Sequence, residues 1–286
     1  ASWKLIKFIA TPDPDPLPTF SPPEMVEIPA GSFLMGDDWG EEDERPQHEV
    51  QLDAYAIAKY ETTNAAYAAF LNAMAEEQAI PKGWIKLEGS YKGEFCRIFQ
   101  QGDRFQVEEG YERHPVLYVS WFGALAYAEW VAKQMGEPYR LPTEAEWERA
   151  AGGGKPDVSQ TFAGSYQADE VAWHHHNSEG KVHRVGRLAA NELGLHDMAG
   201  NVWEWCLDRY DSTAYADSSQ VNPLKWTEGE AAYLEAERVF RGGAWYYHKS
   251  MATVANRNHK APDNRSYSIG FRLARGAAIT LDGSSM

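Results

Sequence analysis

Residues Gly194–Trp205 read GLHDMAGNVWEW, and residues Arg241–Trp245 read RGGAW. In the first stretch Trp203 and Trp205 stand two positions apart, so in a strand their indoles point to the same face of a sheet. In the second stretch the pair Gly242-Gly243 lets another backbone segment or a ligand come close to the chain. Core packing and turn formation are the roles that these residue types favour.

Three stretches upstream have the spacing and the start signals of helices. Apolar residues recur every three or four positions in the first two, and each begins at a hydroxyl residue suited to cap the first turn. The third opens with a capping box, in which Thr143 accepts from an amide ahead and Glu146 reaches back. The predicted helices are Glu61–Gln78 (started by Thr62 or Thr63), Ser120–Met135 (stopped by Gly136) and a short helix from Thr143 to Gly152–Gly154.

Short alternating runs predict strands at Glu49–Ala54, Gly102–Val107, Arg238–Phe240 and Gly270–Leu273. Residues 152–195 and 210–235 show no sustained period, and loops that long in a compact domain usually carry function or pack through their own side chains. We therefore predict an α+β fold with few helices, short strands and much irregular chain. Closely spaced prolines up to Pro23 predict an extended N-terminal arm over residues 1–24, followed by one domain over residues 25–286.

The composition argues against two classes of partner. Acidic residues outnumber basic ones by 42 to 27, for a net charge of −15, and such a surface repels nucleic acid. No stretch of about 18 apolar residues is present, so we expect no membrane insertion.

Cys96 and Cys206 form either one bridge or two buried thiols, and buried thiols are favoured because free cysteine is among the most buried residue types. The chain starts at Ala1, so we expect a trimmed start, with a removed signal peptide as one explanation.

Eight motifs follow one another along the chain. Besides the two quoted above they are IPAGSFLMG (Ile28–Gly36), EDERPQHEV (Glu42–Val50), YETTNAAY (Tyr60–Tyr67), HPV with VSW (His114–Val116, Val119–Trp121), YRLPTEAEWE (Tyr139–Glu148) and GFR (Gly270–Arg272). In this order they resemble the formylglycine-generating-enzyme, or sulfatase-modifying-factor, superfamily, over about residues 25 to 275. The resemblance implies a fold related to C-type lectins. It also implies structural calcium at Asp197 and Asn201, whose hard oxygen atoms suit Ca²⁺.

Copper-dependent members of this superfamily carry two cysteines shortly after the Arg-Gly-Gly motif, and such a soft thiolate pair selects Cu(I). Here Tyr247 matches the first cysteine position and Ala252 the second, while Cys96 and Cys206 lie elsewhere. We therefore expect no copper bis-thiolate site and no oxidation of a sulfatase cysteine. The identity of any redox cofactor is left open.

An aromatic and titratable cluster follows the Arg-Gly-Gly motif instead. We predict three catalytic residues: His248 as a general base, Tyr247 as a residue that passes the proton on or orients hydroxyls, and Arg257 as the anchor of a carboxylate. A planar ligand is expected to stack on an indole. The predicted substrate-binding residues are Trp205, Trp245, Tyr246 and Arg241. The alternative, that Tyr246 and Tyr247 only fill the space of the cysteines, stays open at this point.

A second cluster is the run His174-His175-His176, followed by His183. In an extended run His174 and His176 share one face, where they would bind a metal together with His183 or Asp169. A histidine run in a polar loop is more often simply exposed, and no spacing here matches a zinc or non-haem iron pattern. Simple exposure is therefore favoured over metal binding.

Two functions from different classes follow from the resemblance. One branch of the superfamily matures the siderophore pyoverdine in the periplasm, which makes this chain a candidate oxidoreductase acting on the dihydro chromophore of a precursor. Another branch displays variable loops, which makes it a candidate non-catalytic module that binds a ligand or a protein. The expected partner is a small peptide or siderophore precursor, and the oligomeric state is left open. Convergence of Tyr247, His248 and Arg257 on one pocket would favour the enzyme, whereas a flat aromatic patch would favour binding.

Overall fold

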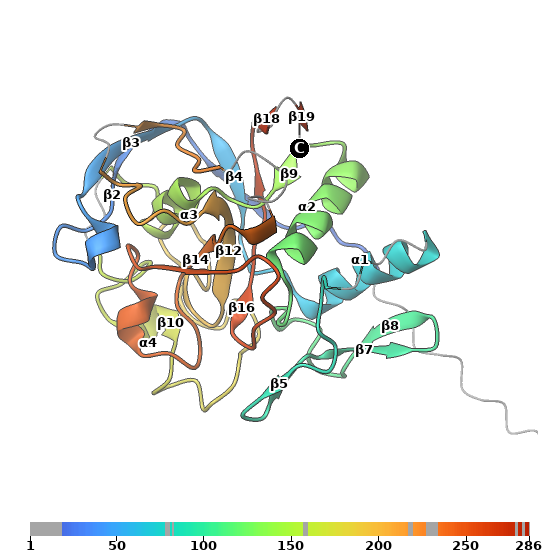
Figure 1. The fold of residues 1–286 in the computed structure, drawn as a ribbon. Helices are drawn as coiled ribbons and strands as arrows, with labels where there is room; N and C mark the ends of the chain where they lie inside the picture. The colour runs from blue at the N-terminus through green and yellow to red at the C-terminus, as the bar shows by residue number, and fades with distance from the viewer. Residues whose placement is uncertain are drawn as a thin grey trace, which may run out of the picture.

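The computed structural model describes residues 19–77, 81, 83–156, 160–216, 220–226, 234–277, 280–281 and 284–285. Residues 1–18, which include most of the predicted proline-rich arm, lie outside this set. Short strands and a few helices are joined by long irregular segments, as Figure 1 shows. Among the described residues no helix is long and apolar enough to cross a membrane.

The three predicted helices are present and begin at the predicted caps. Helix α1 spans Asn64–Glu76, and of the two possible caps it is Thr63 that accepts from the Ala66 amide. Helix α2 spans Trp121–Met135, between the Ser120 cap and Gly136, whose φ is 68°. Helix α3 spans Glu144–Ala151 and opens with the full capping box. The other helical segments are α4 (Ala168–Val171), η1 (Glu42–Glu44) and η2 (Lys249–Ala252).

The strands form two four-stranded sheets and several smaller ones. The first sheet has the order β1 (Met25–Ile28), β4 (Tyr55–Ala58), β17 (Ala274–Arg275), β9 (Tyr139–Arg140), and the second has the order β15 (Arg257–Lys260), β14 (Arg238–Arg241), β12 (Trp203–Arg209), β16 (Ile269–Gly270). A three-stranded sheet has the order β13 (Gln220–Val221), β3 (His48–Leu52), β2 (Gly31–Met35). The remaining pairs are β5 (Ser90–Tyr91) with β6 (Glu94–Phe95), β7 (Ile98–Gln101) with β8 (Arg104–Val107), β10 (Ala172–Trp173) with β11 (Ala199–Gly200), and β18 (Thr280–Leu281) with β19 (Ser284–Ser285).

Three of the four predicted strands correspond to β3, β8 and β14, and the fourth needs a correction. In the stretch Gly270–Leu273 the strand β16 ends at Gly270, and the next three residues are not in a strand. Their backbone makes separate contacts instead of a ladder: Phe271 O accepts from Thr62 N at 2.8 Å, and Leu273 O accepts from Ala58 N at 2.7 Å.

Large aromatic side chains fill the core between α1, α2 and the second sheet. Trp203 and Trp205 lie on β12 as predicted, and both indoles are buried. Cys206 follows Trp205 on β12 and is a buried free thiol. Cys96 is also a free thiol, so Cys96 and Cys206 form no disulfide bridge. Burial raises the pKa of the Cys96 thiol to about 11, which keeps it protonated at neutral pH.

Helix α3 is buried along its whole length and carries its charges into the interior. Glu144 accepts from Arg241 Nη1 at 2.8 Å and from Arg257 Nε at 2.7 Å. Glu148 accepts from Arg241 as well and from Gly36 N at 2.7 Å. Burial alone would raise the pKa of Glu144, but the Arg257 and Arg241 guanidiniums outweigh it and lower this pKa. Two carboxylates thus balance two guanidiniums inside the protein.

Replacing Glu144 by glutamine removes one of these four charges. Because two buried guanidiniums then face a single carboxylate, we expect Glu144→Gln to lower the free energy of unfolding by about 3–5 kcal/mol. Guanidinium chloride unfolding followed by tryptophan fluorescence measures the change. The control is Glu137→Gln at the more exposed pair with Arg275, where the expected change is below about 1 kcal/mol. Equal losses in the two variants would contradict the structural role of Glu144.

Candidate functional site

The segment after β14 turns sharply at the Arg-Gly-Gly motif. Gly242 and Gly243 have φ values of 100° and 77°, and a side chain at Gly243 would place its Cβ 2.8 Å from the Met251 carbonyl oxygen. Only glycine therefore fits there without a backbone shift. The turn directs the next residues outward, so that Tyr246 and Tyr247 are half-buried and His248 is exposed.

Aromatic and basic side chains from four distant segments gather at this point. We call them the tyrosine–histidine surface. The segments are the β5–β6 turn, the loop after β10, the loop after β14 and the segment before β16. The members of the surface are Tyr91, Lys92, His175, His176, Tyr246, Tyr247, His248 and Tyr267, all of them half-buried or exposed.

Tyrosine rings form the centre of the tyrosine–histidine surface. Tyr91 stacks on Tyr267 with ring centroids 3.9 Å apart, and Tyr246 meets the Tyr267 ring edge-on at 5.7 Å. The hydroxyls of Tyr247 and Tyr267 lie 3.4 Å apart. The carbonyl of Tyr267 accepts from the Trp245 indole at 3.1 Å, which attaches this layer to the buried core. The rings therefore hold a fixed arrangement.

Lys92 sets the charge at one end of the surface. Its ammonium donates to the Tyr246 hydroxyl at 2.6 Å. This hydrogen bond is the main cause that lowers the pKa of Tyr246 below that of an ordinary phenol, because the cation favours the phenolate. The surface thus offers a polarised phenol beside neutral ones.

The histidines of the surface contact one another through their ring edges. The centroids of His176 and His248 are 5.6 Å apart, and those of His175 and Tyr246 are 5.9 Å apart. The His175 amide donates to the Tyr247 carbonyl at 2.9 Å and so joins the two loops. His248 Nδ1 lies 3.0 Å from the Ser250 hydroxyl, which leaves its other ring nitrogen directed away from this contact.

The run His174–His176 is not extended, which corrects the expectation of one shared face. Residues 175–177 form a turn, and His174 alone is buried, with its Nε2 2.7 Å from Asp169. His183 stacks on Trp173 instead, with ring centroids 3.8 Å apart. Within the described ranges no three His, Cys, Asp or Glu side chains gather in a way that would hold a metal ion.

Four predicted site residues lie in the interior and not at the surface, which corrects their assignment. Arg241 is fully buried and Arg257 is 5% exposed, and both guanidiniums bind the carboxylates of α3. Trp205 and Trp245 are at most 1% exposed, so neither offers a face for stacking. Tyr247 and His248 share the tyrosine–histidine surface, but Arg257 does not join them.

The predicted calcium ligands have other partners in the structure. Asp197 and Asn201 adopt φ values of 58° and 60°. The Asp197 carboxylate accepts from Gly186 N at 2.7 Å, and the Asn201 amide oxygen accepts from His183 N at 3.0 Å. Burial raises the pKa of Asp197 to about 6. These contacts tie two loops together, and the binding of calcium stays a prediction.

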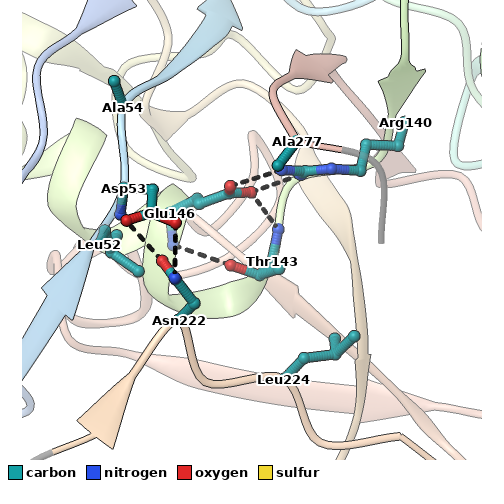
Figure 2. A pocket seen from close by; sticks show the side chains of 9 residues that line it. All are labelled: Leu52, Asp53, Ala54, Arg140, Thr143, Glu146, Asn222, Leu224 and Ala277. Carbon is teal, nitrogen blue, oxygen red and sulfur yellow. Dashed lines mark hydrogen bonds and ion pairs between the residues drawn. The ribbon is translucent and has the colours of Figure 1, made fainter. Parts of the chain in front are cut away.

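A pocket lies elsewhere in the molecule, at the start of α3. Its volume is about 220 Å³, and Figure 2 shows the side chains that line it. Arg140 and Glu146 form a two-point ion pair in it, at 2.6 and 2.7 Å, and Asn222 bonds Asp53. Most polar side chains of this pocket are thus bonded to one another. None of the pocket's residues belongs to the tyrosine–histidine surface.

Sequence reasoning found the centre of this surface but missed five of its members. Tyr246, Tyr247 and His248 follow a recognisable motif, and so they were predicted. Tyr91, Lys92 and Tyr267 are single residues in irregular chain, and no local pattern marks them. His175 and His176 were noted as a run, but their contact with Tyr246 and His248 depends on the path of two separate loops.

Comparisons with known proteins agree with this architecture. The sulfatase-modifying factor enzyme 1-like domain (FGE-sulfatase) matches residues 10–277. The formylglycine-generating enzyme of Streptomyces coelicolor is 34% identical over 307 residues, which cover 89% of this chain and 90% of the enzyme. Among solved structures, PvdO from Pseudomonas aeruginosa is 29% identical with a TM-score of 0.66, over 88% of this chain and 94% of PvdO. These similarities confirm the predicted α+β fold with few helices, short strands and much irregular chain.

One relative is much longer than this chain. The serine/threonine-protein kinase pkn1 of Chlamydia caviae is 35% identical over 270 residues, which cover 91% of this chain and 39% of the kinase. This chain therefore spans less than half the length of that relative.

We expect Lys92→Met to raise the pKa of the Tyr246 phenol, because the substitution removes the cation that favours the phenolate. An NMR titration of ¹³C-labelled tyrosine measures this, with Tyr246→Phe to assign the signal. Lys86→Met, at an exposed lysine in the segment before β5, is the matched control and should leave the titration unchanged. A Tyr246 pKa that does not respond to Lys92→Met would contradict the contact.

Proposed function

Since the chain belongs to the family of sulfatase-modifying factor enzyme 1-like domains, we propose that it is a cysteine-less member that binds a planar aromatic ligand on its tyrosine–histidine surface. The ligand class that we propose is a phenolic or catechol-like group carried by a small peptide or siderophore precursor. One observation carries the proposal. By the motif resemblance Tyr247 matches a position where copper-dependent members have a thiolate, and in the structure it lies within a surface of half-buried and exposed rings.

The chemistry of these side chains suits binding. Tyrosine rings supply stacking faces and edges for a planar ligand, and their hydroxyls supply hydrogen bonds. Lys92 and the three histidines add cationic or donor groups for the oxygens of a phenolate or a peptide carboxylate. A phenol is a poor ligand for Cu(I), so this arrangement does not replace the thiolate pair in copper chemistry.

A second candidate is the oxidation of the dihydro chromophore of a pyoverdine precursor in the periplasm. The similarity to PvdO supports it, as does the absence of the thiol pair. In this case His248 would accept a proton from the substrate, and the two electrons would pass to an external two-electron oxidant. A positioned base contributes about 10²–10⁴-fold in rate. Arg257 is not available as the substrate anchor, because Glu144 holds its guanidinium. Binding is therefore the function that the geometry favours.

Binding of the proposed ligand can be measured directly. Titration of the protein with the dihydro-pyoverdine precursor, followed by calorimetry, should show saturable binding that Tyr246→Ala weakens by roughly 3- to 10-fold, since an aromatic pair contributes about 0.5–1.5 kcal/mol. His259→Ala is the control, because His259 stacks on Tyr210 outside the tyrosine–histidine surface. Absence of binding, or equal losses in both variants, would rule the proposal out.

The absorbance of the precursor distinguishes binding from oxidation. We expect the precursor to bind without a change in its chromophore absorbance, because Arg257, the predicted substrate anchor of the oxidase, is held by Glu144 and does not join Tyr247 and His248. An absorbance change that wild type produces and His248→Ala does not would instead establish the oxidase. Circular dichroism must show that the variant is folded. His175→Ala is not a suitable neutral control, because His175 lies against Tyr246.

A further inference from the structure

A pocket of about 270 Å³ lies between the N-terminal segment and the first turn of α1, apart from the tyrosine–histidine surface. The segment Thr19–Glu24 forms one wall. It is held by the Phe20 ring, which meets Trp130 edge-on at 4.9 Å, and by Glu24, whose carboxylate lies 2.7 Å from the Lys59 ammonium. The opposite wall is formed by residues 60–66 and by Tyr127 of α2.

Two hydroxyl groups in this pocket have no hydrogen-bond partner among the described residues. Tyr127 is 2% exposed and Thr62 is 8% exposed, and both line the pocket. Neither hydroxyl makes a hydrogen bond with any residue in the described part of the chain. Neither hydroxyl oxygen is shielded from solvent, so water or a ligand can reach both of them. Each is therefore free to form a hydrogen bond with a polar ligand that enters the pocket.

Arg113 supplies positive charge to the same pocket. Its side chain is exposed and forms no ion pair with a carboxylate of the described residues, so its guanidinium is available to an acid. The two glutamates nearby are engaged: Glu24 pairs with Lys59, and Glu61 accepts from Asn201 Nδ2 at 2.7 Å. Burial also raises the pKa of Glu61, which reduces its negative charge.

The other lining residues and the volume of the pocket limit the size and chemistry of its ligand. Alanines and prolines make much of the wall, and the first-turn amide of Ala66 is already taken by the Thr63 hydroxyl at 3.3 Å. Recognition therefore depends on side chains and not on the helix terminus. The volume lies just below the roughly 300–1,000 Å³ of sites for drug-sized ligands, which points to a smaller molecule.

We propose that this pocket binds a small hydroxycarboxylate. Arg113 holds the carboxylate through its planar pair of donors, and the hydroxyls of Tyr127 and Thr62 bond the hydroxyl of the ligand. The short carbon chain contacts the apolar wall. This site is independent of the proposed function of the tyrosine–histidine surface.

The test uses L-lactate as the probe and propane-1,2-diol, which lacks the carboxylate, as its matched analogue. Calorimetry and ligand-observed NMR on the full chain at neutral pH should show binding of lactate but not of the diol. Arg113→Gln should weaken lactate binding at least about 10-fold, because it removes a charged hydrogen-bond donor, and Tyr127→Phe roughly 3- to 10-fold, because it removes a neutral one. Arg184→Gln, at an exposed arginine outside the pocket, is the control and should change nothing.

A second measurement separates ligand recognition from a structural role. Without lactate, Tyr127→Phe should keep the Tm of the wild type, because the hydroxyl bonds no residue in the part of the chain that the structure describes. A clear fall in Tm would show a structural partner and overturn the proposal. Equal affinity for the diol, no lactate binding in the tens of millimolar, or unchanged binding in Arg113→Gln would overturn it too. Tyr246→Ala should leave lactate binding intact.

Discussion

Glu144 lies between the buried guanidiniums of Arg241 and Arg257, and this contact determines where the rest of the chain can go. It joins the first turn of α3 to the end of β14 and the start of β15. The helix is far from both strands in the sequence. A carboxylate removed from water must be paired, and each of these arginines must be as well. Any arrangement that separates the helix from the two strands therefore leaves an uncompensated charge inside.

The same contact explains why the candidate site is at the surface. Arg241 ends β14 in the interior, and the two glycines that follow turn the chain outward, so Tyr246, Tyr247 and His248 emerge beside η2. The charges suited to holding a substrate are used within the core. What reaches solvent is a set of rings with one lysine at its edge. A site of this kind recognises its ligand through stacking and hydrogen bonds.

Features that depend on neighbouring residues were predictable from the sequence, and features that depend on distant ones were not. Thr63, Ser120 and Thr143 cap helices through contacts three residues away, so each helix start could be read directly. Arg257 looked like a substrate anchor because a sequence shows a charge but not its partner 113 residues away. Tyr91 and Tyr267 stack with ring centroids 3.9 Å apart, yet no local sequence pattern near either residue predicts this contact.

We propose that Tyr247 and Ala252, at the two positions matched to cysteines, change what the site can do, even though the scaffold is retained. A thiolate pair holds a soft, redox-active ion, and the ion supplies the chemistry. Burial raises the pKa of Tyr267, and its hydrogen bond with Tyr247 acts in the same direction, so this phenol stays neutral and keeps a proton that it can donate. Lys92 lowers the pKa of Tyr246, which favours the phenolate of that residue. Two phenols with opposite tendencies, held on one rigid layer, can bind the donor and the acceptor oxygens of a catechol-like ligand at the same time. The surface therefore has a physical basis for selectivity that needs no metal.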